Sequence, residues 1–504
     1  MRIEKAIKNS IASVSLQIII ILLSFIERSI FINVLGAEYL GVHGLFSNIV
    51  SMLSLAELGV GTAIVYSMYK PMADKDTSKI NLLMSIYAKL YKTIGIVILL
   101  LGLAIVPFLD FFIVDNQNIS NVRIYFLLYI LKSAASYFLI YKASIFVVDQ
   151  KEYIVSVNEI IVTIARYIIG IIILSMVKSY FYYLLWLLCI TLIGNIIISK
   201  KADNYYPYIK KRNTTLTLPK EEKRTMAKNI AAMFSHKIGS IVVNSTDNII
   251  ISRFLGIAVV GVYSNYLMIV NAIITIVTLM FNPITASVGN LDVTESEEKK
   301  YDVFSNVLFL NLWIGGFSAI SLQVLLNPFI TLWVGEEFVL STLIVLMIVG
   351  NGYLAVIRKT VLVFRNAMGL FWKDRYKPLF EALINLSLSL MLVSRLGLIG
   401  VFLGTLIATL TTSLWVEPFI LFKYGFKMRV RKYFWKIIVF SMITLLAGLL
   451  TWYTSNMFND SSISSFIIKL ILCTVMPNII FILFFFRTRE FKYYKYILIN
   501  IIKR

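Results

Sequence analysis

The chain contains few of the residues from which disulfide frameworks and metal centres are built. Its 504 residues include only two cysteines and two histidines. Cys189 and Cys473 lie in apolar stretches, where a cysteine ordinarily serves as a small core residue. His43 and His236 lack the spacing of metal ligands. We therefore expect neither a disulfide framework nor a bound metal.

Charged residues are also scarce, at 15% of the chain, whereas hydrophobic residues make up 59%. A soluble domain is about one quarter charged and about half apolar. Runs of about 20 apolar residues recur along the whole chain, and each is long enough to cross a bilayer. The sequence therefore predicts an all-α polytopic membrane protein. A membrane β-barrel would show alternating segments of about ten residues instead.

Motifs of nucleotide hydrolysis and of hydrolytic catalysis are missing from the sequence. It has no Walker-type loop, no HExxH and no G-x-S-x-G. The run Asp74-Lys75-Asp76 resembles the Asp-x-Asp motif of glycosyltransferases, but it lies in a short loop with no nucleotide-binding domain around it. We expect no enzymatic activity and no cofactor.

The apolar runs predict about fourteen membrane-spanning helices. The first run is too long for the apolar core of a signal peptide and no cleavage site follows it, so we interpret it as a retained span. The predicted spans are 11–34, 42–68, 82–108, 122–148, 153–177, 179–199, 228–254, 259–288, 303–333, 338–364, 378–394, 398–422, 433–453 and 466–486.

The basic residues follow the predicted loops in alternation. Lys and Arg number 48 against 27 Asp and Glu, which gives a net charge of +21. They gather at the N-terminus, in the loop 200–227 and in the C-terminal tail, whereas "DFFIVDNQNIS" and "TSNMFNDSSIS" contain none. This alternation predicts that both termini are cytoplasmic. Anionic membrane lipids are expected partners of the basic loops, and nucleic acid is not.

The two halves of the chain are related by an internal repeat with an offset of 220 residues. "LGAEYLGVHGLFSN" begins at Leu35 and "LGIAVVGVYSNYLM" begins at Leu255. "VPFLDFFIV" from Val106 and "NPFITLWVG" from Asn327 recur at nearly the same offset. Each half has an even number of spans, so the repeat is parallel. The predicted parts are a six-helix bundle in 1–199, a cytoplasmic linker in 200–227, a second six-helix bundle in 228–424, and two further spans with a basic tail in 425–504.

Several predicted spans contain charged residues, and each charge at the middle of a membrane costs about 2.5–3.5 kcal/mol. Such residues face water, pair with one another or reach an interface. The deepest groups are mainly cationic, which suits a phosphate or diphosphate passenger. Asp247 follows Glu27 by the repeat offset. The substrate-binding candidates are Arg28, Lys132, Lys237, Arg358 and Lys359, and the ion-pair or coupling candidates are Glu27, Glu57 and Asp247.

Structural ion pairs that lock helices together are the alternative interpretation of these charges. We favour that interpretation for Glu159 and Arg166, which lie two turns apart on one face of the same predicted helix.

The stretch "ERSIFINVLGAEYLGVHGLFSNIVSMLSLAELGVGTAIVYSMYK" resembles the N-terminal part of Wzx-type polysaccharide flippases. "LGIAVVGVYSNYLMIV" in the second half resembles them too. These flippases belong to the multidrug/oligosaccharidyl-lipid/polysaccharide (MOP) superfamily, together with the MATE exporters and the lipid II flippases. Fourteen spans match the flippase branches better than the MATE exporters.

The resemblance implies a V-shaped pair of helical bundles with a central cationic cavity, in the bacterial cytoplasmic membrane. It implies alternating access and transfer of an undecaprenyl-diphosphate-linked oligosaccharide to the outer leaflet, for capsule, exopolysaccharide or cell-wall polymer synthesis. Arg28 and Lys237 would line the cavity, and the last two spans would hold the prenyl tail. Family members couple to a proton or sodium gradient or to the membrane potential, and polymerases and glycosyltransferases would be partners.

Three other functions stay open at this stage. A lipid II flippase or a MATE-like drug exporter would have the same architecture. An exporter of cationic drugs needs an acidic cavity, whereas the deep charges here are mainly basic. A membrane glycosyltransferase or polymerase needs an acidic catalytic residue in a sizeable loop, and the sequence offers none.

Overall fold

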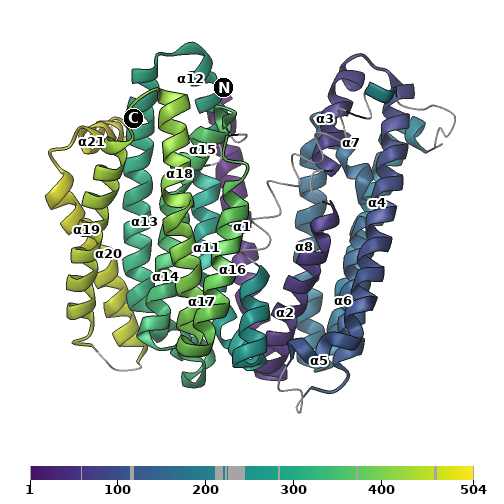
Figure 1. Ribbon diagram of the computed structural model, residues 1–504, viewed down its shortest axis with the longest axis horizontal. Helices are drawn as coiled ribbons and strands as arrows, with labels where there is room; N and C mark the ends of the chain where they lie inside the picture. Colours follow the sequence, from purple (N-terminus) through teal and green to yellow (C-terminus); the bar gives the residue numbers. More distant parts are fainter. Residues whose placement is uncertain are drawn as a thin grey trace. The chain divides into compact units, whose positions relative to one another are not determined.

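The computed structural model describes residues 2–57, 60–113, 119–210, 219–221, 224, 245–281, 284–370, 373–458 and 462–502. In these ranges the regular elements are helices, and no strand occurs among them (Figure 1). Helix dominates because a segment in lipid must satisfy its own backbone N–H and C=O groups, and an α-helix does so within one segment.

Twelve helices in the described ranges are long and apolar enough to cross a membrane. They coincide with twelve of the fourteen predicted spans, and the prediction of an all-α polytopic membrane protein is confirmed. The other two predicted spans, 42–68 and 228–254, include residues outside the described ranges. The described part of 42–68 belongs to α2 (Ala37–Leu53), η1 (Ser54–Glu57) and α3 (Val60–Ala73).

The chain forms two compact units, one made of residues 19–261 and the other of residues 1–18 and 262–504. We call them the N-terminal unit and the C-terminal unit. The boundaries between them fall inside α1 (Arg2–Leu35) and α11 (Ile257–Phe281), so each of these helices contributes to both units.

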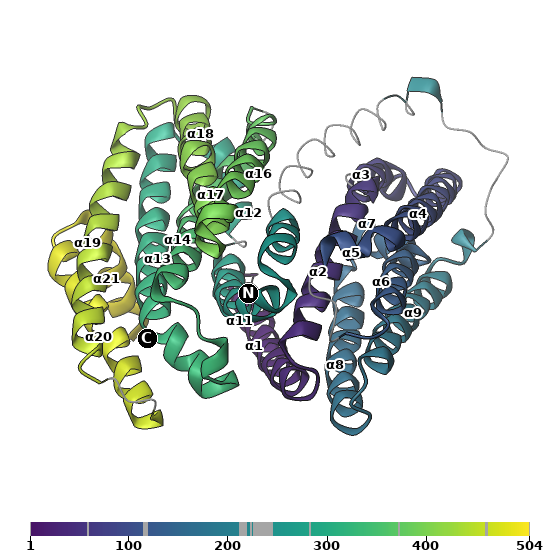
Figure 2. The same cartoon turned by 60° about the horizontal axis from the view of Figure 1, so that its bottom comes forward.

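Long helices packed side by side make up the N-terminal unit. α4 packs against α6, α6 against α9, and α9 against α8 (Figure 2). Part of its core is fully buried around Ile64, Ile98 and Phe146. Besides α2, η1 and α3, its elements are α4 (Thr77–Ile105), η2 (Val106–Phe108), α5 (Leu109–Phe112), α6 (Val122–Tyr137), η3 (Ile140–Ala143), α7 (Ser144–Val148), α8 (Glu152–Met176), α9 (Tyr180–Tyr205), η4 (Pro207–Ile209) and the helical residues 245–255.

The C-terminal unit is built around α13 (Glu297–Val334), a helix of 38 residues. α13 packs against α14, α19 and α20. Phe440 of α19 stacks on Phe485 of α20 with 4.5 Å between ring centroids, which fastens the last two spans to each other. The other elements are α12 (Ile284–Thr294), η5 (Glu336–Phe338), α14 (Thr342–Ile357), α15 (Lys359–Ala367), α16 (Lys377–Leu396), α17 (Leu398–Thr411), α18 (Ser413–Ile420), η7 (Leu421–Phe426), α19 (Arg431–Ser455), α20 (Ile463–Phe485) and α21 (Arg489–Ile502).

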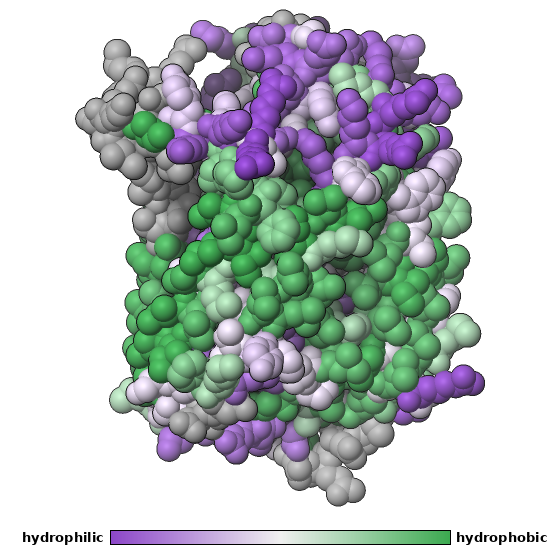
Figure 3. Space-filling model, turned by 90° about the vertical axis from the view of Figure 1, so that its left-hand side faces the viewer, coloured by the Kyte–Doolittle hydropathy of each residue, from purple (hydrophilic) through white to green (hydrophobic). Residues whose placement is uncertain are grey.

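The face of the C-terminal unit that carries α19, α20 and α21 shows a broad apolar band between hydrophilic residues, which are denser at the upper end of the view than at the lower one (Figure 3). Leu445, Leu449 and Ile471 are more than half exposed on α19 and α20, as expected of side chains that contact lipid. The N and C labels both lie at one end of this unit, N near α12 and C near α21 (Figure 1).

Two glycines of the internal repeat let α2 and α11 cross with their backbones in contact. A Cβ built on Gly41 would lie 2.0 Å from the carbonyl oxygen of Ile257, and one built on Gly261 would lie 2.0 Å from the carbonyl oxygen of Ala37. Gly41 and Ala37 correspond to Gly261 and Ile257 at the offset of 220. The glycines that precede these helices, Gly36 and Gly256, correspond as well, with φ of +88° and +95°. The repeat seen in the sequence thus appears as matching backbone geometry.

Candidate functional site

Glu27 lies inside the N-terminal unit, on the face of α1 that meets α8 and α9. Its side chain is only 8% exposed, and its Oε1 atom has no hydrogen-bond partner among the described residues. A Cβ built on Gly170 of α8 would lie 2.8 Å from this atom, so the glycine leaves the space that the carboxylate occupies. The hydroxyl of Tyr183 in α9 lies beside the same carboxylate.

Cationic side chains from three helices surround this carboxylate. Arg166 of α8, Arg28 of α1 and Lys132 of α6 all act electrostatically on Glu27, and the same three act on His43 of α2. Here we call Glu27, Arg28, Lys132 and Arg166 the cationic cluster. The packing of α8 against α9 and of α9 against α6 brings these side chains together from positions far apart in the sequence.

Aromatic rings line the cationic cluster. The Arg166 guanidinium carbon lies 4.0 Å from the ring centroid of Tyr167, and Lys132 Nζ lies 5.5 Å from that of Tyr129. His43 Nδ1 lies 3.3 Å from the hydroxyl of Tyr180. Rings of this kind stabilise a cation through their faces and still leave its N–H groups available to a ligand.

Positive charge exceeds negative charge in this cluster. Even with Arg28 set aside, Lys132 and Arg166 face the single carboxylate of Glu27 within the part of the chain that the structure describes. Holding such an excess inside a membrane protein is costly, so intramembrane charges of this kind ordinarily mark a pathway for a substrate or an ion. Guanidinium and ammonium groups with nearby tyrosine hydroxyls form a suitable environment for a phosphate-type oxyanion.

Arg358, a second substrate-binding candidate, lies in the C-terminal unit within a balanced set of charges. Its Nε and Nη2 atoms donate to the carboxylate of Glu417 at 3.0 Å and 2.7 Å. Lys377 donates to the same carboxylate at 2.6 Å, and Arg365 pairs with Asp374. Glu381 completes the set at 3.6 Å from Lys377 and 3.9 Å from Arg358. Three cations thus meet three carboxylates, an arrangement that suits the locking of α15, α16 and α18 to one another.

Lys359 follows Arg358 directly and is half-buried at the start of α15. The described residues place no carboxylate within ion-pair distance of it, and the charge that acts on it is that of Arg358. Of this adjacent pair, Lys359 is therefore the side chain with more capacity for a ligand.

The three remaining candidates have different surroundings. Glu57 accepts hydrogen bonds from the hydroxyls of Tyr91 and Tyr137 at 2.7 Å and 3.1 Å, so tyrosines rather than cations surround it. Asp247 lies half-buried in the helical residues 245–255 of the N-terminal unit. Lys237 lies outside the described residues, and its assignment stays a prediction.

A model of the family described as "Polysaccharide biosynthesis protein" matches residues 6–287, which is more than half of the chain. The chain belongs to this family. The resemblance to Wzx-type flippases is thereby confirmed at the level of the family. The match includes all four residues of the cationic cluster of this polysaccharide biosynthesis protein, whereas Arg358, Glu417 and the last two spans lie beyond it.

Solved structures of two related kinds share the fold of the polysaccharide biosynthesis protein. "Lipid II flippase MurJ, inward closed conformation" aligns with a TM-score of 0.68 at 15% identity, over 93% of this chain and 98% of that one. An inward-facing MATE multidrug transporter of the MOP superfamily aligns with a TM-score of 0.62 at 14% identity, over 82% and 99%. These likenesses establish a MurJ/MATE-like fold. No curated protein sequence matches the chain.

Sequence reasoning missed several residues of these sites. Arg166 was assigned to a pair with Glu159, yet Glu159 is exposed and the described residues include no ion pair between the two. Glu417 was overlooked although it is an acidic residue in an apolar stretch, which is the same signal that pointed to Glu27. Tyr183 and Tyr129 gave no signal, because tyrosine is common in this protein, with 28 copies.

Proposed function

We propose that this polysaccharide biosynthesis protein moves an undecaprenyl-diphosphate-linked oligosaccharide from the cytoplasmic to the outer leaflet by alternating access. The family match and the fold identify a multi-pass membrane transporter of polysaccharide biosynthesis, in a class of proteins that are normally not enzymes. A lipid-linked glycan is the substrate that this family implies, and the diphosphate is its most charged part.

The observation that supports the proposal best is the cationic cluster. Lys132 and Arg166 face only one described carboxylate, and that carboxylate has a buried oxygen without a described partner. A neutral or cationic passenger would gain nothing from this excess of positive charge. A diphosphate offers several acceptor oxygens, and charge-assisted hydrogen bonds to them are about twice as strong as neutral ones.

Glu27 gives the cluster a means of releasing its ligand. While the cluster is empty, the carboxylate compensates part of the positive charge of Arg28, Lys132 and Arg166. An arriving diphosphate competes with Glu27 for the same cations, so its net binding is weaker than three cations alone would produce. Transport requires such a compromise, because a passenger bound too tightly would not leave.

The lipid II flippase is the nearest alternative and uses the same diphosphate chemistry, so the two differ only in the sugar. A MATE-like exporter of cationic drugs is disfavoured by the positive charge of the cluster. For a membrane glycosyltransferase or polymerase, the described residues show no group of three or more His, Cys, Asp or Glu side chains placed to hold a metal ion.

The proposal is tested by replacing cluster residues in cells that depend on this protein for surface polymer. Lys132→Gln and Arg166→Gln should each lower export at least tenfold and cause the lipid-linked precursor to accumulate. Arg28→Ala should abolish export at near-normal protein abundance, and Arg28→Lys should keep part of it because the charge remains without the bidentate fork. Arg123→Gln is the matched control, since Arg123 forms an exposed pair with Asp110 in the same unit.

Two results would contradict the proposal. One is full export by the double variant Glu27→Gln/Arg28→Gln, because the pair would then serve only to hold helices together. The other is loss of polymer without precursor accumulation, since that places the defect before translocation. Accumulation of lipid II, the precursor of peptidoglycan, instead of the precursor of another surface polymer would identify lipid II as the substrate.

A further inference from the structure

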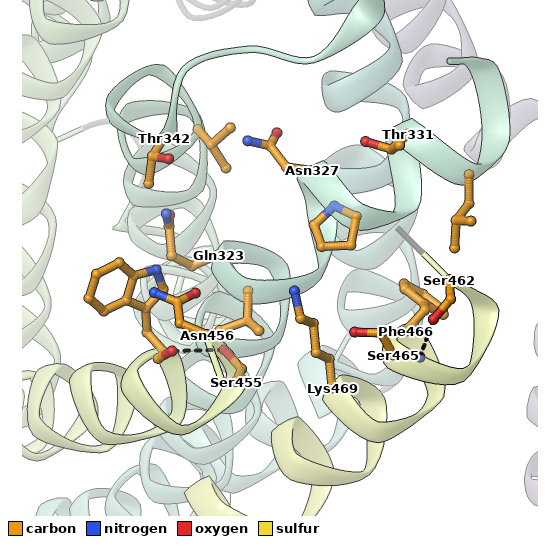
Figure 4. A pocket seen from close by; sticks show the side chains of 15 residues that line it. Gln323, Asn327, Thr331, Thr342, Ser455, Asn456, Ser462, Ser465, Phe466 and Lys469 are labelled. Atoms are coloured by element: carbon orange, nitrogen blue, oxygen red, sulfur yellow. Dashed lines mark hydrogen bonds between the residues drawn. The ribbon is translucent and has the colours of Figure 1, made fainter. Parts of the chain in front are cut away.

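A polar pocket lies within the C-terminal unit, at the ends of four helices (Figure 4). Its volume is about 260 Å³, far above the roughly 10–15 Å³ that a single water requires. α13, α14, α19 and α20 supply its walls, and the described lining contains no carboxylate. It therefore lies apart from the cationic cluster, which belongs to the other unit.

Among the described residues that line this pocket, Lys469 is the only charged one. It lies in α20, in a stretch that is otherwise apolar, and only 7% of it is exposed. The described residues offer it no carboxylate and no hydrogen-bond acceptor within bonding distance, and Figure 4 shows its Nζ directed into the pocket. A buried ammonium group without an anion is costly in a membrane, so the pocket is suited to receive one.

A second polar group in the pocket also lacks a partner. Gln323 of α13 has a buried Oε1 atom with no hydrogen bond among the described residues. By contrast, Asn327 is fully engaged, because it donates to the carbonyl of Leu340 and accepts from the hydroxyl of Tyr266. The pocket thus presents one cation for an anionic group and one free acceptor for a hydroxyl donor.

The pocket lies near one end of the spanning helices, where lipid headgroups are expected. Lys469 is six residues after Ile463, the start of α20, and a rise of 1.5 Å per residue places it about 9 Å from the helix end. Long side chains in helices point back toward the N-terminal end of the helix, so we expect the ammonium group to lie closer still to that end. Trp452 and Leu332 line the pocket and are 43% and 40% exposed, and tryptophan favours the membrane interface.

We propose that this pocket binds the headgroup of phosphatidylglycerol, with Lys469 on the phosphate and Gln323 on a glycerol hydroxyl. The single positive charge matches a single phosphodiester, and the exposed apolar rim suits the adjoining acyl chains. Asn456 and Ser462 line the pocket, which lies at the end of α20 opposite to the C-terminus, so with cytoplasmic termini the lipid comes from the outer leaflet. This site is distinct from the basic cytoplasmic loops and does not depend on the transported substrate.

The test is native mass spectrometry of the full chain in detergent, titrated with phosphatidylglycerol or phosphatidylcholine. Wild type should prefer phosphatidylglycerol about fivefold, the effect of one lysine on an anionic lipid, and Lys469→Gln should lose this preference. Lys178→Gln is the matched control, because Lys178 is exposed in a loop on the same predicted side. Gln323→Leu keeps the charge and should erase discrimination between phosphatidylglycerol and phosphatidic acid.

Equal binding of phosphatidylglycerol by wild type and Lys469→Gln would overturn the proposal. So would binding of sn-glycerol 3-phosphate as strong as that of the lipid, because the ligand would then be a soluble phosphate. Preferential binding of soluble glucuronate would also overturn it and assign the pocket to an acidic sugar.

Discussion

Arg358 holds Glu417 through two hydrogen bonds, from Nε at 3.0 Å and from Nη2 at 2.7 Å, and the side chain of Glu417 is fully buried. Lys377 donates to the same carboxylate from α16. Arg365 of α15 lies 3.8 Å from it, so α15, α16 and α18 are joined at one acidic residue that pairs with three cations.

Replacing Glu417 with Gln should destabilise the C-terminal unit strongly. Arg358, Arg365 and Lys377 would then share only two carboxylates, and breaking a buried ion pair costs about 3–5 kcal/mol. We expect a marked drop in apparent melting temperature in detergent and in membrane abundance. Glu297→Gln is the control, because its pair with Lys427 is exposed and should contribute almost nothing. An unchanged melting temperature for Glu417→Gln would argue against a structural role for this network.

The reciprocal crossing of α2 and α11 predicts that alanine is poorly tolerated at Gly41 and at Gly261. A new Cβ would meet a backbone oxygen at 2.0 Å, and backbone atoms cannot swing aside as a flexible side chain does. Either substitution should cost about 1–3 kcal/mol, measurable by thermal unfolding. Gly350→Ala serves as the comparison, since its nearest neighbour would be 3.9 Å away. Equal stability of the Gly41→Ala and Gly350→Ala variants would refute the close crossing.

The attachment of α21 should weaken in acid. Burial raises the pKa of Glu490, but hydrogen bonds from Lys436 at 2.6 Å and Ser305 at 2.7 Å outweigh it, and the net pKa is lowered from its ordinary 4.5. A lowered pKa in the folded state means that the stabilisation is present above pH 4.5 and is lost as the pH falls through the folded pKa.

A comparison of wild type with Glu490→Gln at several pH values tests this attachment. The wild type should be more stable by about 1 kcal/mol at pH ~7, and the difference should shrink toward pH ~4. A difference that stays constant over this range would exclude titration of Glu490 as its cause.

The positive-inside pattern predicts the orientation of the chain, which single-cysteine labelling can measure. In a Cys189→Ser background, which removes the exposed native cysteine, Lys178→Cys should react with an impermeant thiol reagent in intact cells. Lys75→Cys is equally exposed but should react only after the membrane is permeabilised. The reverse pattern would invert the orientation and with it the proposed direction of transport.

The spans could be predicted from sequence because hydropathy is a local property. Each run such as 122–148 or 466–486 is long enough to span a bilayer whatever its neighbours are. The repeat could also be recognised from sequence, since Leu35–Gly36 and Leu255–Gly256 directly precede equivalent helices. Local patterns therefore defined the fold class and much of the helix order.

The partners of the buried charges could not be predicted, because they depend on which helix faces meet. Arg166 shares a helical face with Glu159, but the packing of α8 turns it toward Glu27 on α1. The hydrogen bonds of Glu57 with Tyr91 and Tyr137 could not be predicted, because these tyrosines are 34 and 80 residues away in sequence. A charge in an apolar run shows that a partner or a ligand is needed, and tertiary structure decides which.

The crossing of α2 and α11 also bears on how the chain arose. Gly41 meets the start of α11 as Gly261 meets the start of α2, which is the reciprocal contact that identical subunits make across a two-fold axis. A single-repeat ancestor would have formed this contact between the two subunits of a homodimer. In such a homodimer, any substitution at this glycine would have altered the contact at both of its symmetry-related positions. After fusion each copy could change by itself, and Ser264 now stands where the first repeat keeps Gly44. The asymmetry of a transporter that must favour one direction could begin from such independent changes.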